Sequence, residues 1–158
     1  MPACGTCTMC CKLMGIPELK KKPTKWCGHC DIGHGCKIYE ERPTSCHEFE
    51  CYYRMVPNLP ISMRPDKAKV LIAPTTNSRV ISVHCDPGYP DAWQKEPFYS
   101  HLKAIVEDGT VAVVSNSLGT KKIALRRTGP GIISKQTIEM SEPDENGMQW
   151  YTHKEETA

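Results

Sequence analysis

Nine of the ten cysteines in this chain lie between Cys4 and Cys51, so the first third of the molecule has to fold around thiols. Four of them stand in a single run, C-G-T-C-T-M-C-C, which begins at Cys4 and ends at Cys11. A deprotonated thiol is a strong ligand for Zn²⁺, Cu(I) and iron–sulfur clusters. Cysteines at this density therefore predict a metal-bound segment with little hydrophobic core of its own.

The spacing of the run allows two local structures. A helix over residues 4–11 would place Cys4, Cys7 and Cys11 on one face. Alternatively, a tight turn at a Cys-x-x-Cys pair would aim both sulfur atoms at one ion. Further ligands must come from later in the chain, and the candidates are Cys27, Cys30, Cys36, Cys46 and Cys51, with His29, His34 and His47 in reserve.

A second stretch of the sequence connects this run to a known pattern. After Cys27 comes Gly35-Cys36-x-Ile-Tyr-x-x-Arg42-Pro43-x-x-Cys46. Together with the first run, this order resembles the zinc- or iron-chelating CxxCxxCC domain family, the YkgJ-like cysteine cluster proteins. The resemblance covers residues 4–51. Cys30 is additional to the family pattern, and His47 stands where many relatives have arginine.

The resemblance implies a set of eight metal ligands. They are Cys4, Cys7, Cys10, Cys11, Cys27, Cys36, Cys46 and Cys51. Eight thiolates suit two Zn²⁺ ions in closed four-thiolate sites, which leave no open position for a substrate, so we assign no catalytic residue. The alternative cofactor is iron or a [4Fe–4S] cluster with a redox or modification-enzyme role. A flagellin lysine methylase bears a similar cysteine motif. A zinc-ribbon adaptor is a weaker alternative.

The charge of the chain argues against nucleic acid as a partner. The formal net charge is only +2, and residues 61–158 carry twelve basic and twelve acidic side chains. A basic face, which nucleic-acid binding usually requires, does not stand out. Thiolates bound to zinc would make the balance more negative. Metal ions are thus the expected partners, and the sequence indicates no protein partner.

The sequence also predicts where the protein works. No stretch approaches the roughly 18 apolar residues of a membrane helix. The chain opens on M-P-A-C, without a basic region followed by an apolar one, so we expect no signal peptide. We therefore expect a cytoplasmic protein, where thiols stay reduced and many cysteines indicate metal rather than disulfides.

The rest of the chain predicts an α+β fold. β-Branched runs at 69–73 and 79–83, and at 110–114 and 122–125, read as two hairpins, with a helix over 96–107 between them. We expect a small antiparallel sheet with this helix on one face. The expected parts are a cysteine-cluster region (1–56), a Pro-rich linker (57–66), an α+β part (67–135) and a polar tail (136–158).

Three smaller features leave specific expectations. The lysines at 20–22 are expected in a solvated turn. Cys85 ends a strand and is expected to be a buried apolar residue, although His84, Cys85 and Asp86 together could donate a ligand to the metal part. In the tail, Trp150 and Tyr151 are candidates to dock on the body of the protein.

Overall fold

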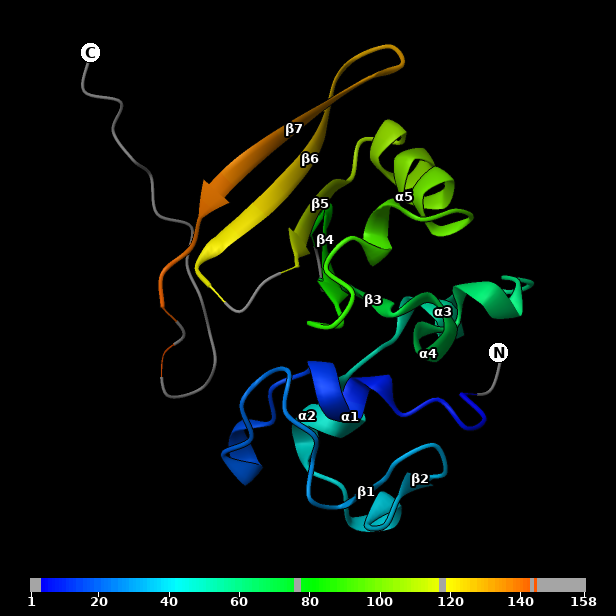
Figure 1. The fold of residues 1–158 in the computed structure, drawn as a ribbon, viewed down its shortest axis with the longest axis vertical. Helices are drawn as coiled ribbons and strands as arrows, with labels where there is room; N and C mark the ends of the chain where they lie inside the picture. The colour runs from blue at the N-terminus through cyan, green and yellow to red at the C-terminus, as the bar shows by residue number, and fades with distance from the viewer. Residues whose placement is uncertain (1–3, 76–77, 117–118, 143, 145–158) are drawn as a thin grey trace.

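The computed structural model describes residues 4–75, 78–116, 119–142 and 144, and it contains two parts (Figure 1). A five-stranded sheet with one long helix forms the body, and the cysteine-rich segment lies against one end of it. Met9 and Leu13 from the cysteine-rich segment belong to the same hydrophobic cluster as the strands. The two parts therefore share one core. Most of the expected polar tail, with Trp150 and Tyr151, lies outside the described residues.

The strands of the large sheet lie side by side in chain order. They are β3 (Val70–Pro74), β4 (Val80–Cys85), β5 (Val111–Ser115), β6 (Lys121–Gly129) and β7 (Ile132–Glu139). The pairs β3–β4, β5–β6 and β6–β7 are antiparallel, whereas β4–β5 is parallel. The α+β class is confirmed, but the expectation of an entirely antiparallel sheet is wrong at its centre.

The parallel pair follows from the connection between its strands. After β4 the chain passes through η4 (Ala92–Gln94) and α5 (Phe98–Glu107) before it enters β5. A helix of ten residues carries the chain back along the length of the sheet, so the next strand starts at the same end as the previous one. Two separate hairpins, as the sequence suggested, would not need this return.

Helix α5 covers one face of the sheet. Its buried residues Phe98, Leu102 and Val106 recur every four positions and form one apolar stripe, as predicted. The helix ends at Glu107 with Asp108 as its C-cap, and Gly109 follows with a positive φ of 94°, which favours glycine. In the part of the chain that the structure describes, no helix has both the length and the apolar character to cross a membrane.

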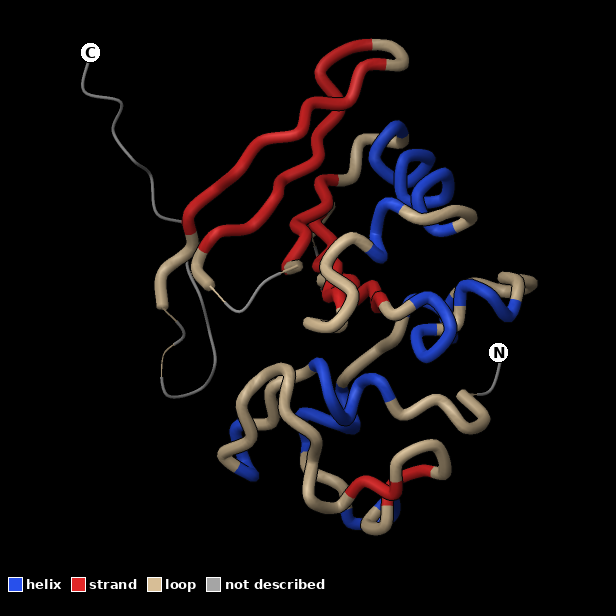
Figure 2. Tube along the Cα trace, in the orientation of Figure 1, coloured by secondary structure: helices blue, strands red, loops and turns tan. Residues whose placement is uncertain are grey.

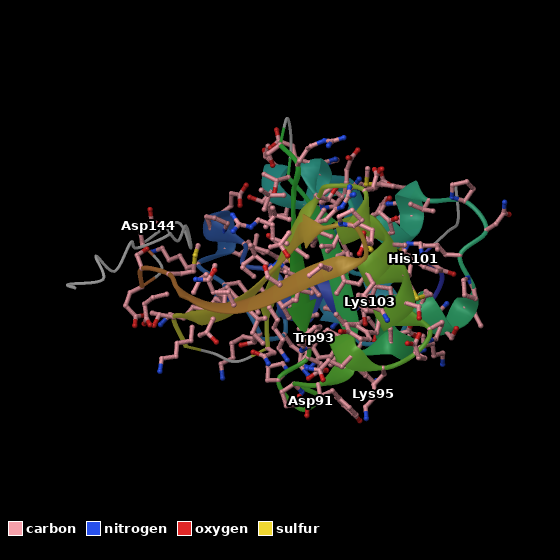
Figure 3. The ribbon with its side chains drawn as sticks, turned by 90° about the horizontal axis from the view of Figure 1, so that it is seen from above. Asp91, Trp93, Lys95, His101, Lys103 and Asp144 are labelled. Atoms are coloured by element: carbon pink, nitrogen blue, oxygen red, sulfur yellow. The ribbon has the colours of Figure 1, made fainter. Side chains whose placement is uncertain are left out.

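Aromatic contacts fix α5 to its surroundings, and two of the residues that make them, Trp93 and His101, are labelled in Figure 3. Trp93 of η4 is buried, and its ring meets Tyr99 edge-on at a centroid distance of 5.8 Å. At the other side of the helix, the Tyr52 hydroxyl lies 3.0 Å from His101 Nε2. His101 is half-buried.

Strand β7 was not expected from the sequence. It pairs with β6 along most of its length and crosses residue 135, where the polar tail was expected to begin. Its central residues Lys135, Gln136 and Thr137 are exposed because β7 is an edge strand. Alternation of apolar and polar residues is therefore weak here, and the strand is specified by its pairing with β6.

The cysteine-rich part consists of short elements joined by loops (Figure 2). They are α1 (Met9–Leu13), η1 (Pro17–Leu19), β1 (Cys30–Asp31), β2 (Gly35–Cys36), η2 (Tyr39–Glu41) and α2 (Thr44–Glu48). From residue 17 to residue 50 no residue is buried. This segment has no hydrophobic core that could hold it in place, so other interactions have to do so.

Three further elements join the two parts. They are α3 (Tyr52–Met55), η3 (Ile61–Met63) and α4 (Pro65–Ala68). Residues 57–66, expected as a Pro-rich linker, thus contain η3 and the start of α4, and Met63 is buried in the shared core. Arg64 and Asp66 form a bidentate ion pair, with N–O distances of 2.6 and 2.7 Å.

Candidate metal centre

The first two cysteines lie in a tight turn and not in a helix. The N–H of Cys7 donates to the carbonyl oxygen of Cys4 at 3.0 Å, and Gly5 has a positive φ of 55°. Helix α1 starts only at Met9, so the shared face of Cys4, Cys7 and Cys11 that a helix over residues 4–11 would give does not form. The turn is the second of the two local structures that the spacing allowed.

A second turn of the same spacing begins at Cys27. The N–H of Cys30 donates to the carbonyl oxygen of Cys27 at 3.1 Å, and the N–H of His29 points at the Cys27 sulfur at 3.5 Å. The chain then forms the β1–β2 hairpin, in which Cys30 pairs with Cys36. This hairpin brings a third cysteine next to the turn.

Main-chain hydrogen bonds hold the second turn against α1. The N–H of Cys27 donates to the carbonyl oxygen of Cys11 at 3.0 Å, and Thr24 donates to that of Leu13 at 3.3 Å. The Thr8 hydroxyl accepts a hydrogen bond from the N–H of Gly33 at 3.1 Å. As a result, cysteines that are far apart in the sequence lie along the same short helix.

One set of neighbouring thiols, the first thiol group, consists of Cys4, Cys7 and Cys51. Burial raises the pKa of Cys51 to about 11, and the nearby Cys4 and Cys7 raise it further while N–H donors at Tyr53 and Arg54 oppose the rise. The pKa of Cys4 is also raised by burial, although the charges of Arg54 and Arg64 lower it. Basic side chains at this group favour thiolate.

A larger set, the second thiol group, surrounds α1 and the hairpin. Its members are Cys10, Cys11, Cys27, Cys30, Cys36 and Cys46. The pKa of Cys11 is raised mainly by a hydrogen bond with Cys10 and also by burial. The pKa of Cys46, in the first turn of α2, is raised by burial and by the neighbouring Cys11, Cys27 and Cys36. Neighbouring thiols thus oppose the ionisation of Cys11, Cys30 and Cys46.

Cys30 lies in the second thiol group, although the family pattern does not count it among the eight ligands. Its thiol is in hydrogen-bonding contact with the thiol of Cys11 and with the hydroxyl of Thr8. Burial raises the pKa of Cys30 to about 11, and Cys11 adds to the rise. The sequence signal that could have identified it is the two-residue spacing between Cys27 and Cys30, which matches that between Cys4 and Cys7.

Lys21 lies at the edge of the second thiol group. Its Nζ donates to the carbonyl oxygens of Lys12, Met14 and Lys22, so this lysine is not in the solvated turn that was expected. Burial lowers the pKa of Lys21, whereas the thiolates of Cys27 and Cys11 oppose that decrease. Its ammonium group can compensate negative charge on the sulfur atoms.

No family model, no curated protein and no solved structure matches this chain. The resemblance to the CxxCxxCC family therefore stays an expectation.

The other candidate ligands have surroundings different from those of the two thiol groups. His29, His34 and His47 are exposed. Cys85 is 4% exposed and lies in the hydrophobic core, as expected for a packed thiol. Asp86 does reach the cysteine-rich part, but through an ion pair with Lys12 of α1 in which Nζ is 2.9 Å from Oδ2. It is held as a charge partner and not as a metal ligand.

The thiols are close neighbours without forming a finished site. Within residues 4–75, 78–116, 119–142 and 144, no three Cys, His, Asp or Glu side chains are arranged as a group that could hold a metal ion. The donor chemistry nevertheless fits a soft cation, because the neighbouring donors are sulfur and the thiols repel one another when they ionise. A cation would replace the protons and reverse this repulsion.

Proposed function

We propose that residues 4–51 bind zinc or iron through thiolates, and that two zinc ions are the favoured load. The observation that carries the proposal is the gathering of nine thiols in a part of the molecule where residues 17–50 include no buried residue. A segment that cannot bury apolar surface needs a different source of stability, and thiolate–metal bonds provide it. The favoured role is metal binding without catalysis.

The division of the thiols supports two ions. The first thiol group offers three sulfur atoms, and Cys4 also interacts with Cys11 of the second group. The second group offers six, which is more than the four that one tetrahedral zinc site uses. Reduced thiols are a further requirement, and all ten cysteines are free in the structure. We therefore propose the cytoplasm as the compartment.

The experiment that tests this proposal is metal analysis of the full chain, purified without air and without a metal-binding tag, together with its absorption spectrum. We expect about two zinc ions per chain and no band near 400 nm. About four iron atoms with a brown chromophore that reductant bleaches would replace the zinc assignment with an iron–sulfur cluster. Protein without bound zinc or iron would rule out the proposed function.

Single substitutions locate the ligands. Cys7→Ser removes a member of the first thiol group and Cys46→Ser a member of the second, and each should lower the metal content by about one ion. Cys85→Ser is the matched control, because Cys85 is buried in the core of the sheet. The ligand assignment is wrong if either of the first two variants keeps its full metal content and the wild-type melting temperature.

A further inference from the structure

A hollow of about 500 Å³ lies beside the second thiol group. Its lining includes the four lysines Lys20, Lys21, Lys22 and Lys25, together with Trp26 and His29, and it includes no aspartate or glutamate. The formal charge of the whole chain is only +2, so this is a local concentration of positive charge. Such a concentration raises the local concentration of an anionic ligand.

Three of these lysines are free to bind. Among the described residues, no hydrogen-bond acceptor or acidic partner contacts the ammonium groups of Lys20, Lys22 or Lys25. Lys21 differs, because its Nζ is already bonded to main-chain carbonyl oxygens. Lys21 is thus the lysine that faces the thiols, and the other three are available to a ligand in the hollow.

Trp26 adds a flat apolar surface to this charge. Its side chain is one of the exposed large hydrophobic residues, at 37%. Lys12 approaches the ring, with Nζ 5.7 Å from its centre. An exposed indole ring beside lysines can stack on a planar ring while the lysines bind phosphate groups.

The volume of the hollow limits the size of the ligand. About 500 Å³ is within the usual range for small-molecule and cofactor sites and is far more than one phosphate ion needs. The lining combines several lysine ammonium groups with one exposed indole ring. A nucleotide has both of the matching parts.

We propose that this hollow binds a nucleotide, with its phosphates on Lys20, Lys22 and Lys25 and its base on Trp26. The site contains no glycine-rich phosphate loop, so charge and stacking, and not main-chain N–H groups, carry the recognition. Cys27 belongs to the lining, so a bound nucleotide lies next to the second thiol group. The proposal goes beyond metal binding and does not depend on which metal is bound.

The test uses the full chain as purified, titrated by calorimetry with ATP, inorganic tripolyphosphate and a short single-stranded oligothymidylate. We expect ATP to bind, and to bind at least about fivefold more tightly than tripolyphosphate, because only ATP can stack. Trp26→Ala should remove that difference. Lys22→Glu with Lys25→Glu should weaken ATP binding about tenfold or more.

Lys95→Glu is the control, because Lys95 (labelled in Figure 3) is an exposed lysine that does not line the hollow. Its affinity for ATP should match that of the wild type. Metal content is measured for every variant. The proposal is overturned if the wild type does not bind ATP. It is also overturned if the double variant, Lys22→Glu with Lys25→Glu, binds ATP as tightly as the wild type. Tighter binding of the oligothymidylate than of ATP overturns it in favour of single-stranded nucleic acid.

One remaining outcome assigns the lysines a different role. If the Lys22→Glu, Lys25→Glu double variant has a lower metal content and the wild type does not bind ATP, the lysines act only as countercharge for the thiolates. The nucleotide proposal is then wrong. Loss of metal binding from wild-type protein in the separate metal analysis would contradict the proposed function and leave the ATP titration as it stands. The two failures can therefore be told apart.

Discussion

At the residue scale, Cys30 is the cysteine that the family pattern leaves out and that the structure places beside other thiols of the second group. The family pattern counts eight cysteines and leaves Cys30 out. In the structure, its thiol contacts that of Cys11, and its main chain pairs with Cys36. If the second thiol group binds a metal ion as proposed, a thiol in this position would be a ligand or would donate a hydrogen bond to one.

We expect Cys30→Ser to lower the metal content of the second thiol group or to weaken its affinity at least about tenfold, the usual effect of losing a ligand or its supporting partner. The measurement is competition with a chromophoric chelator at fixed pH. Cys85→Ser serves again as the control, since its thiol is buried elsewhere. Wild-type affinity in Cys30→Ser would show that Cys30 has no part in the centre.

The sequence was enough to mark the cysteines as candidate ligands, but it did not show which of them become neighbours. Spacing identifies Cys4 and Cys7 as a pair, and the same spacing at Cys27 and Cys30 repeats the signal. Which pairs become neighbours depends on main-chain contacts such as that between Cys27 and Cys11, which join residues that no local pattern connects. The role of Lys21 was hidden for the same reason.

At the scale of elements, one ion pair fastens α1 to the end of β4. Lys12 of α1 donates to both carboxylate oxygens of Asp86, at 3.0 and 2.9 Å, and the Asp86 side chain is only 9% exposed. Burial alone would raise the pKa of Asp86. Hydrogen bonds from Lys12 and the Gly88 N–H outweigh burial and hold this pKa below its usual value of 3.8.

We expect Asp86→Asn to lower the free energy of unfolding by about 2 kcal/mol at neutral pH, the usual contribution of hydrogen bonds to a charged group. Because the folded pKa is depressed, this stabilisation is present above pH 3.8 and is lost as the pH falls through the lower folded value. The difference between wild type and variant, measured by urea unfolding, should therefore stay constant from pH 7 to about pH 4 and shrink as the pH falls below 3.8.

Asp91→Asn is the matched control, because Asp91 is an exposed aspartate close by in sequence. It should change the free energy of unfolding by less than about 0.5 kcal/mol. If Asp86→Asn were as stable as Asp91→Asn at neutral pH, the ion pair would contribute nothing to holding α1 on the sheet.

Most elements of the sheet were predictable to within a few residues, and their arrangement was not. The expected helix over 96–107 is α5, and the strand runs appear as β3, β4, β5 and β6. The order strand–helix–strand did contain a signal for the parallel pair, because a helix between two strands permits the chain to return. Strand β7 carries exposed polar residues at an edge, so its periodicity could not reveal it.

At the scale of the whole molecule, the two parts differ in what stabilises them. The body buries Val83, Leu102, Val106 and Val114 completely, whereas residues 17–50 bury nothing. Apolar burial contributes about 25 cal/mol per Å², so the body has a source of stability that this segment lacks. The shared core reaches the cysteine-rich part only through α1 and the residues around α3.

Removal of metal should therefore unfold one part of the molecule and leave the other folded. After treatment with a strong chelator, we expect amide hydrogen exchange to become fast over residues 17–50 and to stay slow in β4, β5 and α5, because metal binding and folding are coupled only where no core exists. Adding zinc back should make amide hydrogen exchange over residues 17–50 slow again. The residues around Asp86 provide an internal control, because the ion pair between Asp86 and Lys12 of α1 lies at the border between the segment expected to unfold and the body expected to stay folded. Equal protection of both parts without metal would mean that main-chain contacts alone hold the segment, and loss of protection throughout would mean that the sheet depends on the metal as well.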